Sequence, residues 1–350
     1  MQDNCSIILF DKNIPLSDSY SDTTPIGSVS TEPSNLFDKV QFWTINADHQ
    51  GQRIDNFLFT QLKGVPKSRI YRILRKGELR VNKGRVKAVY KLKNGDVLRI
   101  PPIRVAEKKD DSQLSKLDKV RDLENCILLE TKQFMVINKP SGIAVHGGSG
   151  LSFGVIEAFR ALRPKEKFLE LVHRIDRDTS GCLLIAKRRS FLIHFQNQLR
   201  HRKMNKEYIA IVSGRWSADF KRVDVPLLKK ELPSGERIVV VDKNGKPSET
   251  RFSLLEQLGD YSLIQAKPVT GRTHQIRVHA RHCHCPLLGD EKYSDLNADR
   301  DILKKLKIKT FMLHAKRLSF TLPETLERVE VEAPIPAKMD TVLTLLKKNI

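Results

Sequence analysis

Long apolar runs, abundant cysteine and a basic N-terminal targeting segment are all missing from this 350-residue sequence. No stretch of about 18 uninterrupted apolar residues occurs, so the sequence predicts no membrane-spanning helix. The five cysteines are an odd number, scattered over positions 5, 126, 182, 283 and 285, and they predict no disulfide framework. Because no basic segment followed by an apolar one opens the chain, we expect no secretory signal and a reduced, cytoplasmic location.

The common cofactor-binding motifs are absent too. The sequence contains no GxxxxGK[ST] phosphate loop, no GxGxxG after a predicted strand and no GxSxG nucleophile elbow. The segment "HCHC" (282–285) is the only metal-like cluster, and it lacks the second pair of ligands that a structural zinc site needs. The sequence therefore predicts neither a nucleotide cofactor nor a metal.

Positive charge is what the sequence has in excess, with a formal net charge of +21. The segment 51–105 holds fifteen Lys and Arg against three Asp and Glu, whereas residues 1–50 hold seven acids and two bases. A balance this basic, concentrated in one segment, indicates a polyanionic partner. The alternative is a solvated basic face without a ligand.

The chain divides by composition into four parts. Residues 1–42 are rich in Ser, Asp, Thr and Pro, which predicts a disordered acidic leader. The basic module 51–105 follows, and 106–122 is a charged linker. In 123–350 strand-like segments outnumber helical ones and do not alternate with them one to one. This pattern predicts an α+β domain with a large mixed, mainly antiparallel sheet flanked by helices.

The basic module reads as two short helices followed by small strands. Helical spacing predicts a first helix that buries Ile54, Phe57, Leu58 and Leu62. In the second helix Ser68 is the expected cap, Gly77 the expected end, and the buried stripe consists of Ile70, Ile73 and Leu74. The dipeptide Asn94-Gly95 predicts a β-hairpin turn. This order resembles the S4 RNA-binding domain. The residues that we expect to bind RNA are Arg53, Lys67, Arg69, Arg72, Arg75, Lys76, Arg80, Lys83 and Arg85, with Arg272 from the later domain.

One carboxylate stands out among the candidates for chemistry. Asp176 lies in "HRIDRDTSG" (173–181), between a strand-like run and a glycine turn, and is flanked by Arg174 and Arg177. Two neighbouring arginines favour the ionised carboxylate, which is the state that a nucleophile requires. The alternative is an ion pair that holds the turn. The fragment by itself leaves both interpretations open.

The wider motif context favours the nucleophile. The segments "NKPSGIAVHGG" (138–148), "HRIDRDTSG", "NKEYIAIVSG" (205–214) and "VTGRTHQIRVHARH" (269–282) occur in this order. Together they resemble the pseudouridine synthases of the RluA family, and the resemblance spans roughly residues 43 to 340. It implies that Asp176 is the nucleophile and that Arg174 enters the base stack as the target uridine flips out. It further implies that Tyr208 packs against the uracil and is a candidate base, and that Arg277 pairs with the carboxylate.

The resemblance also implies an activity that suits the missing cofactor motifs. Isomerising uridine to pseudouridine breaks the N1–C1′ bond and rejoins the same base through C5, so no group or electron enters. The expected substrate is 23S RNA of the large ribosomal subunit or its precursor, and we expect a monomer. Attack at C1′, attack at C6 and loss of uracil to a glycal all remain open. Two rival functions are a synthase acting on transfer RNA and a non-catalytic ribosomal assembly factor.

Three of the candidate residues also have a purely structural interpretation. Tyr208 could be a core aromatic residue, and Arg272 and His274 could fix the start of a helix rather than contact phosphate.

Overall fold

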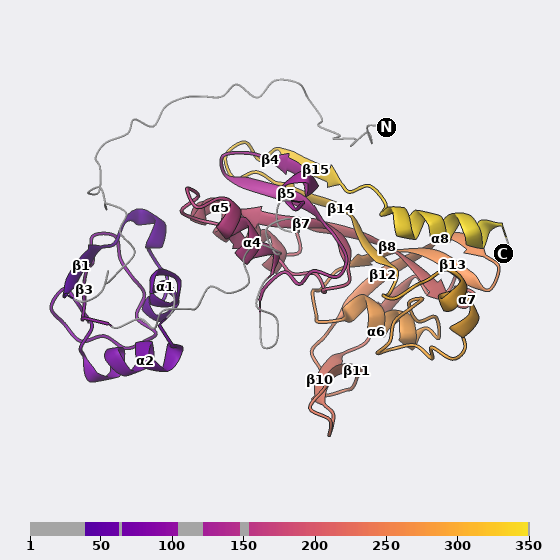
Figure 1. Cartoon of the computed structure of the whole chain (residues 1–350), viewed down its shortest axis with the longest axis horizontal. Coiled ribbons are helices and arrows are strands. Elements are labelled where there is room, and N and C mark those ends of the chain that lie inside the picture. Colours follow the sequence, from indigo (N-terminus) through magenta and orange to yellow (C-terminus); the bar gives the residue numbers. More distant parts are fainter. Residues whose placement is uncertain (1–38, 63–64, 104–121, 148–153, 349–350) are drawn as a thin grey trace. The chain divides into compact units, whose positions relative to one another are not determined.

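The computed structural model describes residues 39–62, 65–103, 122–147 and 154–348. They form two compact units, one before residue 104 and one after residue 121, and each is described by itself (Figure 1). The expected leader up to residue 38 and the expected linker up to residue 121 lie outside the described residues. No helix in the described ranges is long and apolar enough to cross a membrane.

The N-terminal unit packs two helices against a three-stranded antiparallel sheet with the order β1-β3-β2. Its elements are β1 (Gln41–Thr44), η1 (Ala47–His49), α1 (Ile54–Gln61), α2 (Lys67–Lys76), β2 (Arg80–Val81) and β3 (Val97–Ile100). All seven apolar residues expected inside the two helices are buried in one core cluster. The unit reaches back to β1, which lies before the expected start at residue 51 and takes in two residues of the expected leader.

Of the two predicted ends of α2, the C-terminal one is confirmed and the N-terminal one is wrong. The helix ends as expected at Gly77, which adopts the left-handed conformation with φ 69°. The expected cap at Ser68 is wrong, because α2 already begins at Lys67 and its N-cap residue is Pro66, which makes no side-chain capping bond. The carbonyl of Pro66 accepts the first hydrogen bonds of the helix, from the amides of Arg69 and Ile70.

The predicted hairpin at Asn94-Gly95 is also wrong, although the turn itself forms. The amide of Asp96 donates to the carbonyl of Lys93, and Gly95 has φ 83°. No strand precedes the turn, because the Asp96 carboxylate accepts hydrogen bonds from Asn82, from Tyr90 and from the Lys93 amide. These bonds hold the segment before the turn as a loop, and β3 pairs with β1 and β2 instead.

The C-terminal unit is built on a ten-stranded sheet with the order β4-β5-β7-β14-β8-β13-β12-β9, to which β15 and β6 add at β14 and β7. Its strands are β4 (Ile127–Glu130), β5 (Phe134–Lys139), β6 (Glu170–Leu171), β7 (Ser180–Ala186), β8 (Asn205–Ser213), β9 (Arg222–Asp224), β12 (Glu249–Leu258), β13 (Tyr261–Pro268), β14 (Leu313–Thr321) and β15 (Arg328–Glu332). A separate hairpin consists of β10 (Leu227–Glu231) and β11 (Arg237–Val241). The helices are η2 (Glu124–Cys126), α4 (Val155–Leu162), α5 (Arg189–Arg200), α6 (Gln275–His282), α7 (Arg300–Lys305) and α8 (Ala337–Lys347).

Alternating side chains divide this sheet into two packed faces. Leu183 and Ile185 of β7 join a cluster with α4 and α6, whereas Leu184 joins a second cluster with α5 on the opposite face. Further along, α8 covers the face of β8 that carries Ile209. Pairing is antiparallel except between β7 and β14, so the expected mixed, mainly antiparallel sheet with flanking helices is confirmed.

The parallel pairing between β7 and β14 requires a glycine at position 181. Gly181 has φ 102°, and a Cβ added there would lie 2.2 Å from the carbonyl oxygen of Ala315. Only glycine allows the two backbones to approach so closely. Because Gly181 ends the segment 173–181, this close approach fixes where the loop that carries Asp176 leaves the sheet.

Candidate active site

A cleft of about 620 Å³ opens over the segment that carries Asp176. Its walls come from five stretches that are far apart in the sequence: 144–147, 174–178, 273–277, 289–292 and 309–311. The loop between β6 and β7 brings Asp176, and the start of α6 brings His274 and Arg277. The cleft therefore lies where the loop before β7 meets the N-terminal end of α6.

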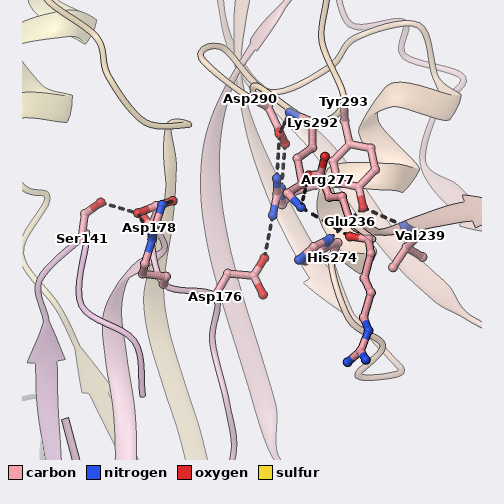
Figure 2. A network of polar contacts seen from close by, with 12 residues as sticks. Ser141, Asp176, Asp178, Glu236, Val239, His274, Arg277, Asp290, Lys292 and Tyr293 are labelled. Atoms are coloured by element: carbon pink, nitrogen blue, oxygen red, sulfur yellow. Dashed lines mark hydrogen bonds and ion pairs between the residues drawn. The ribbon is translucent and has the colours of Figure 1, made fainter. Parts of the chain in front are cut away.

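Asp176 meets an arginine held by a second carboxylate (Figure 2). Nη1 of Arg277 lies 3.3 Å from Oδ2 of Asp176, while Nε and Nη2 each lie 2.7 Å from an oxygen of Asp290. The side chain of Asp290 is fully buried and that of Arg277 is 7% exposed, whereas Asp176 keeps 28% of its side-chain surface exposed. Asp290 thus anchors the guanidinium, and Asp176 presents a carboxylate to the cleft.

Aromatic rings enclose the same guanidinium. The central carbon of Arg277 lies 4.3 Å from the ring centre of Phe311 and 4.9 Å from that of Tyr293. Burial opposes the charge on Arg277, but the hydrogen bonds and charge of Asp290 outweigh it and raise the pKa of Arg277. The cation next to Asp176 is therefore permanent and restricted to one orientation.

A buried lysine ties down the loop that carries Asp176. Lys139, at the end of β5, is fully buried, and its Nζ donates to the carbonyls of Pro140, Ile143 and Arg177 at 2.7, 2.9 and 2.9 Å. Burial lowers the pKa of Lys139 to about 7, although the charges of Asp178 and Asp176 oppose the shift. The three carbonyls match the three N–H groups of the charged form. Through its bond to the Arg177 carbonyl, Lys139 holds the loop that carries Asp176 against the end of β5.

The two arginines beside Asp176 in the sequence do not pair with it. The guanidinium of Arg177 forms two hydrogen bonds with Asp178 instead. Arg174 is exposed and lines the cleft. The cationic contact of Asp176 is Arg277, 101 residues further along, which is the pairing that the family resemblance implies. Neighbouring side chains in an extended loop diverge, so adjacency in sequence does not bring them together.

Tyr208 is not among the residues that line the cleft. It occupies the middle of β8, is 8% exposed, and points to the sheet face that α4 and α6 cover. Burial raises the pKa of Tyr208, and the nearby charge of Asp176 adds to the effect. The phenol is therefore neutral at physiological pH.

Asp290, which sequence reasoning missed, completes the site together with Tyr293 and His274. Asp290, in "GDEKY" (289–293), gave no signal beyond its turn-like context. Its neighbour Tyr293 accepts a hydrogen bond from the Val239 amide, and its hydroxyl lies 2.7 Å from Nδ1 of His274. His274 begins α6 in the left-handed conformation, and burial, together with the charges of Arg277 and Lys292, lowers its pKa. Tyr293 thus links the β10–β11 hairpin to the helix that carries Arg277 (Figure 2).

No set of three or more potential ligands that could hold a metal occurs within the described residues. In the "HCHC" segment Cys283 and Cys285 are buried in the main apolar cluster, and burial raises the pKa of Cys283 to about 11. These thiols stay protonated and pack as small apolar side chains.

The residues expected to bind RNA differ in their solvent exposure and in whether their charged groups already have a partner. Arg72, Arg75 and Lys76 are exposed along α2, Lys83 and Arg85 are exposed beyond β2, and Arg69 is half-buried. Arg53 is bound to Asp55 by two hydrogen bonds, and Lys67 lies over the ring of Phe59. Arg272 donates to the carbonyl of Pro247 next to the start of α6. The basic face of α2 is therefore the part of this set most open to a polyanion.

Comparison with known proteins assigns the two units. Residues 133–282 match the family of RNA pseudouridylate synthases, and residues 52–98 match the S4 domain. The chain belongs to the pseudouridine synthase family and is an isomerase. It is 55% identical over 310 residues to ribosomal large subunit pseudouridine synthase C of Yersinia pestis, covering 89% of this chain and 97% of that protein. The same enzyme of Escherichia coli K12 is 54% identical over 309 residues, covering 88% and 97%.

A solved structure agrees with this assignment. Human RNA pseudouridylate synthase domain containing 4 is 28% identical and superposes with a TM-score of 0.56, covering 67% of this chain and 98% of that chain. The expected succession of an S4 domain and a synthase domain is confirmed.

Proposed function

We propose that this enzyme converts specific uridines of 23S ribosomal RNA, in the large subunit or its precursor, to pseudouridine. The observation that carries the chemistry is the partly exposed carboxylate of Asp176, which faces the cleft against Arg277. The choice of substrate is supported by the relatives at 54–55% identity, which bear the name of a large-subunit enzyme. We propose that the enzyme acts as a monomer in the cytoplasm and needs no cofactor.

In this proposal Asp176 is the nucleophile. The N1–C1′ bond of the uridine breaks, the detached uracil turns, and C5 bonds to C1′ while the hydrogen on C5 leaves and N1 gains a proton. Attack at C1′, attack at C6 and departure of uracil to a glycal all need the same ionised oxygen in reach of a flipped-out nucleotide. Arg277, held by Asp290, keeps that carboxylate oriented.

Arg174 and Tyr208 have separate roles in the proposal. Arg174 is exposed at the cleft, so it can enter the base stack as the uridine leaves. Tyr208, which is 8% exposed and outside the cleft lining, would pack against the uracil once the flipped nucleotide is bound. Its raised pKa argues against the role of general base, because the phenolate needed to accept a proton is not populated at neutral pH.

The N-terminal unit would hold the RNA through phosphates along α2. Arg72, Arg75 and Lys76 point away from the buried stripe of this helix. Phosphate contacts position a protein on RNA without reading its sequence, so this unit would tether the substrate while the cleft selects the uridine.

Mapping pseudouridines in cells that lack the chain tests the substrate. We expect specific pseudouridines to disappear from 23S RNA and to return when the gene is restored, with transfer RNA unchanged. Losses confined to transfer RNA would support the rival synthase. An unchanged map in both RNAs would support the non-catalytic assembly factor.

A charge-removal variant tests the tether. Arg69, Arg72 and Lys76 are changed together to Gln, and we expect weaker binding of ribosomal RNA with a salt slope reduced by about 2–3 units, close to one for each phosphate that is no longer neutralised. Binding is measured by titration at several salt concentrations. The matched control changes Lys304, Lys305 and Lys348 to Gln, which removes the same charge from exposed positions of the other unit. If both triple variants lower the slope equally, the effect is one of net charge and α2 is not the tether.

A further inference from the structure

The outer face of the small N-terminal sheet carries an aromatic side chain exposed to solvent. Phe42 of β1 is 67% exposed, and Val40 and Val97 on the same face are 37% and 39% exposed. Strand pairing sets Phe42 directly opposite Arg99 of β3, and Arg80 of β2 opposite Arg99 on its other side. Residues directly opposite each other in antiparallel strands share one face. Phe42, Arg99 and Arg80 therefore form one row across the sheet, here called the sheet row.

The core does not need this phenylalanine. The alternate residues Val81, Leu98 and Ile100 fill the other face of the sheet and are buried against α1 and α2. With a period of two, the register that buries these residues necessarily turns the sheet row outward. Register explains why position 42 faces water, but neither packing nor register explains why a large aromatic ring occupies it beside two arginines.

The sheet row continues the basic surface of α2. Nη1 of Arg99 donates to the carbonyl of Glu78 at 2.9 Å, and Nε of Arg80 donates to that of Gly77 at 3.3 Å. A Cβ added at Gly77 would lie 2.6 Å from Nε of Arg85, so that guanidinium sits against the same turn. Three arginines therefore gather on the residues that directly follow α2.

That turn begins where the basic face of α2 ends, at Arg75 and Lys76. Among the described residues, no ion pair joins Arg80 or Arg99 to a carboxylate, and the only groups of Glu78 and Gly77 that they engage are backbone carbonyls. Positive charge consequently runs from α2 onto the sheet and meets an exposed ring at its far end. A polyanion lying on α2 could extend over this turn, past Glu78, to Phe42.

We propose that the sheet row is a binding site for single-stranded RNA, in which one unpaired base stacks on Phe42 while the adjoining phosphates contact Arg99 and Arg80. Stacking on an aromatic side chain combined with a cationic groove is how proteins bind unpaired nucleic acid without reading its sequence. The bases of an RNA duplex are stacked on one another, so the ring of Phe42 would select an unpaired strand. That strand would adjoin the RNA duplex whose phosphates α2 contacts. This inference rests on the proposed RNA substrate and adds a strand-selective contact to it.

Variants at Phe42 in the full-length chain test the site. The probes are a fluorescent RNA hairpin with a single-stranded tail and the same hairpin with a blunt end. We expect Phe42→Ala to weaken binding of the tailed hairpin by about tenfold, the usual cost of removing one stacked base, and to leave the blunt hairpin within about twofold. Phe42→Trp, which keeps a stacking ring, should bind the tailed hairpin at least as well as the unaltered chain.

Phe42→Leu separates stacking from simple apolar contact. It keeps an apolar side chain and removes the ring, so it should behave like Phe42→Ala, and thermal melting should be the same for all variants because the side chain is exposed. Wild-type binding of the tailed hairpin by Phe42→Ala would overturn the proposal. So would full binding by Phe42→Leu, which would mean that an apolar side chain without a ring serves equally and that no base stacks on Phe42. These binding results are independent of the pseudouridine map, so failure of this site and failure of the proposed substrate can be told apart.

Discussion

Asp176→Asn is expected to abolish pseudouridine formation. If Asp176 is the nucleophile, the amide cannot attack, and the rate at saturating RNA should fall by about 10⁴-fold or more. The change is nearly isosteric, and Arg277 keeps both hydrogen bonds to Asp290, so the fold should not change. The measurement is release of hydrogen from C5 of labelled uridine in 23S RNA fragments, together with the RNA dissociation constant, which should stay within about twofold because phosphates dominate affinity.

The matched control is Asp178→Asn, two residues away in the same loop. Asp178 is 16% exposed and pairs with Arg177, which is 58% exposed, and a pair with one exposed partner contributes about 1 kcal/mol. We expect activity to fall by no more than about fivefold, the rate equivalent of that energy. Turnover by Asp176→Asn close to that of the control would remove Asp176 as the nucleophile.

Asp290→Ala should damage both stability and rate, although Asp290 is not placed to touch the substrate. The change leaves the guanidinium of Arg277 buried without its main partner, which costs about 3–5 kcal/mol of unfolding free energy. Arg277 would also lose the anchor that orients Asp176, and misplacement of a reacting group by about 1 Å can cost about 10²-fold in rate. Because Asp290 acts as a positioning residue, kcat should fall while KM for RNA changes little.

A double variant separates the two effects. Arg277→Met combined with Asp290→Leu replaces the buried ion pair by apolar side chains, which is often neutral for stability. We expect thermal stability to recover relative to Asp290→Ala, while activity stays low because no cation faces Asp176. Recovery of activity along with stability would mean that Asp290 and Arg277 serve only the fold.

Local patterns of the sequence were enough to predict the buried helix faces, the fold class, the family and the charge of the partner. The buried stripes of α1 and α2 were predicted from helical spacing, because a helix presents every third or fourth residue to the core. The class of the larger unit followed from the succession of strand-like and helical segments. The ordered motifs around Asp176, Tyr208 and Arg277 indicated the family, and the excess of Lys and Arg in 51–105 indicated a polyanionic partner.

Tertiary structure decided which groups meet. The family resemblance implied that Arg277 pairs with Asp176, and the structure brings the two together across 101 residues, whereas Arg177 bonds to Asp178. Asp290 could not be recognised as the anchor of that arginine, because an isolated acid in a turn carries no periodic signal. In the N-terminal unit, the segment before Asn94-Gly95 forms a loop and not the expected strand, because it is hydrogen-bonded to the Asp96 carboxylate. Spacing along the chain reports only which neighbours share a face. The partners of a buried charge depend on how distant elements pack, because such a charge is tolerated only where an opposite charge or hydrogen-bond acceptors are in place.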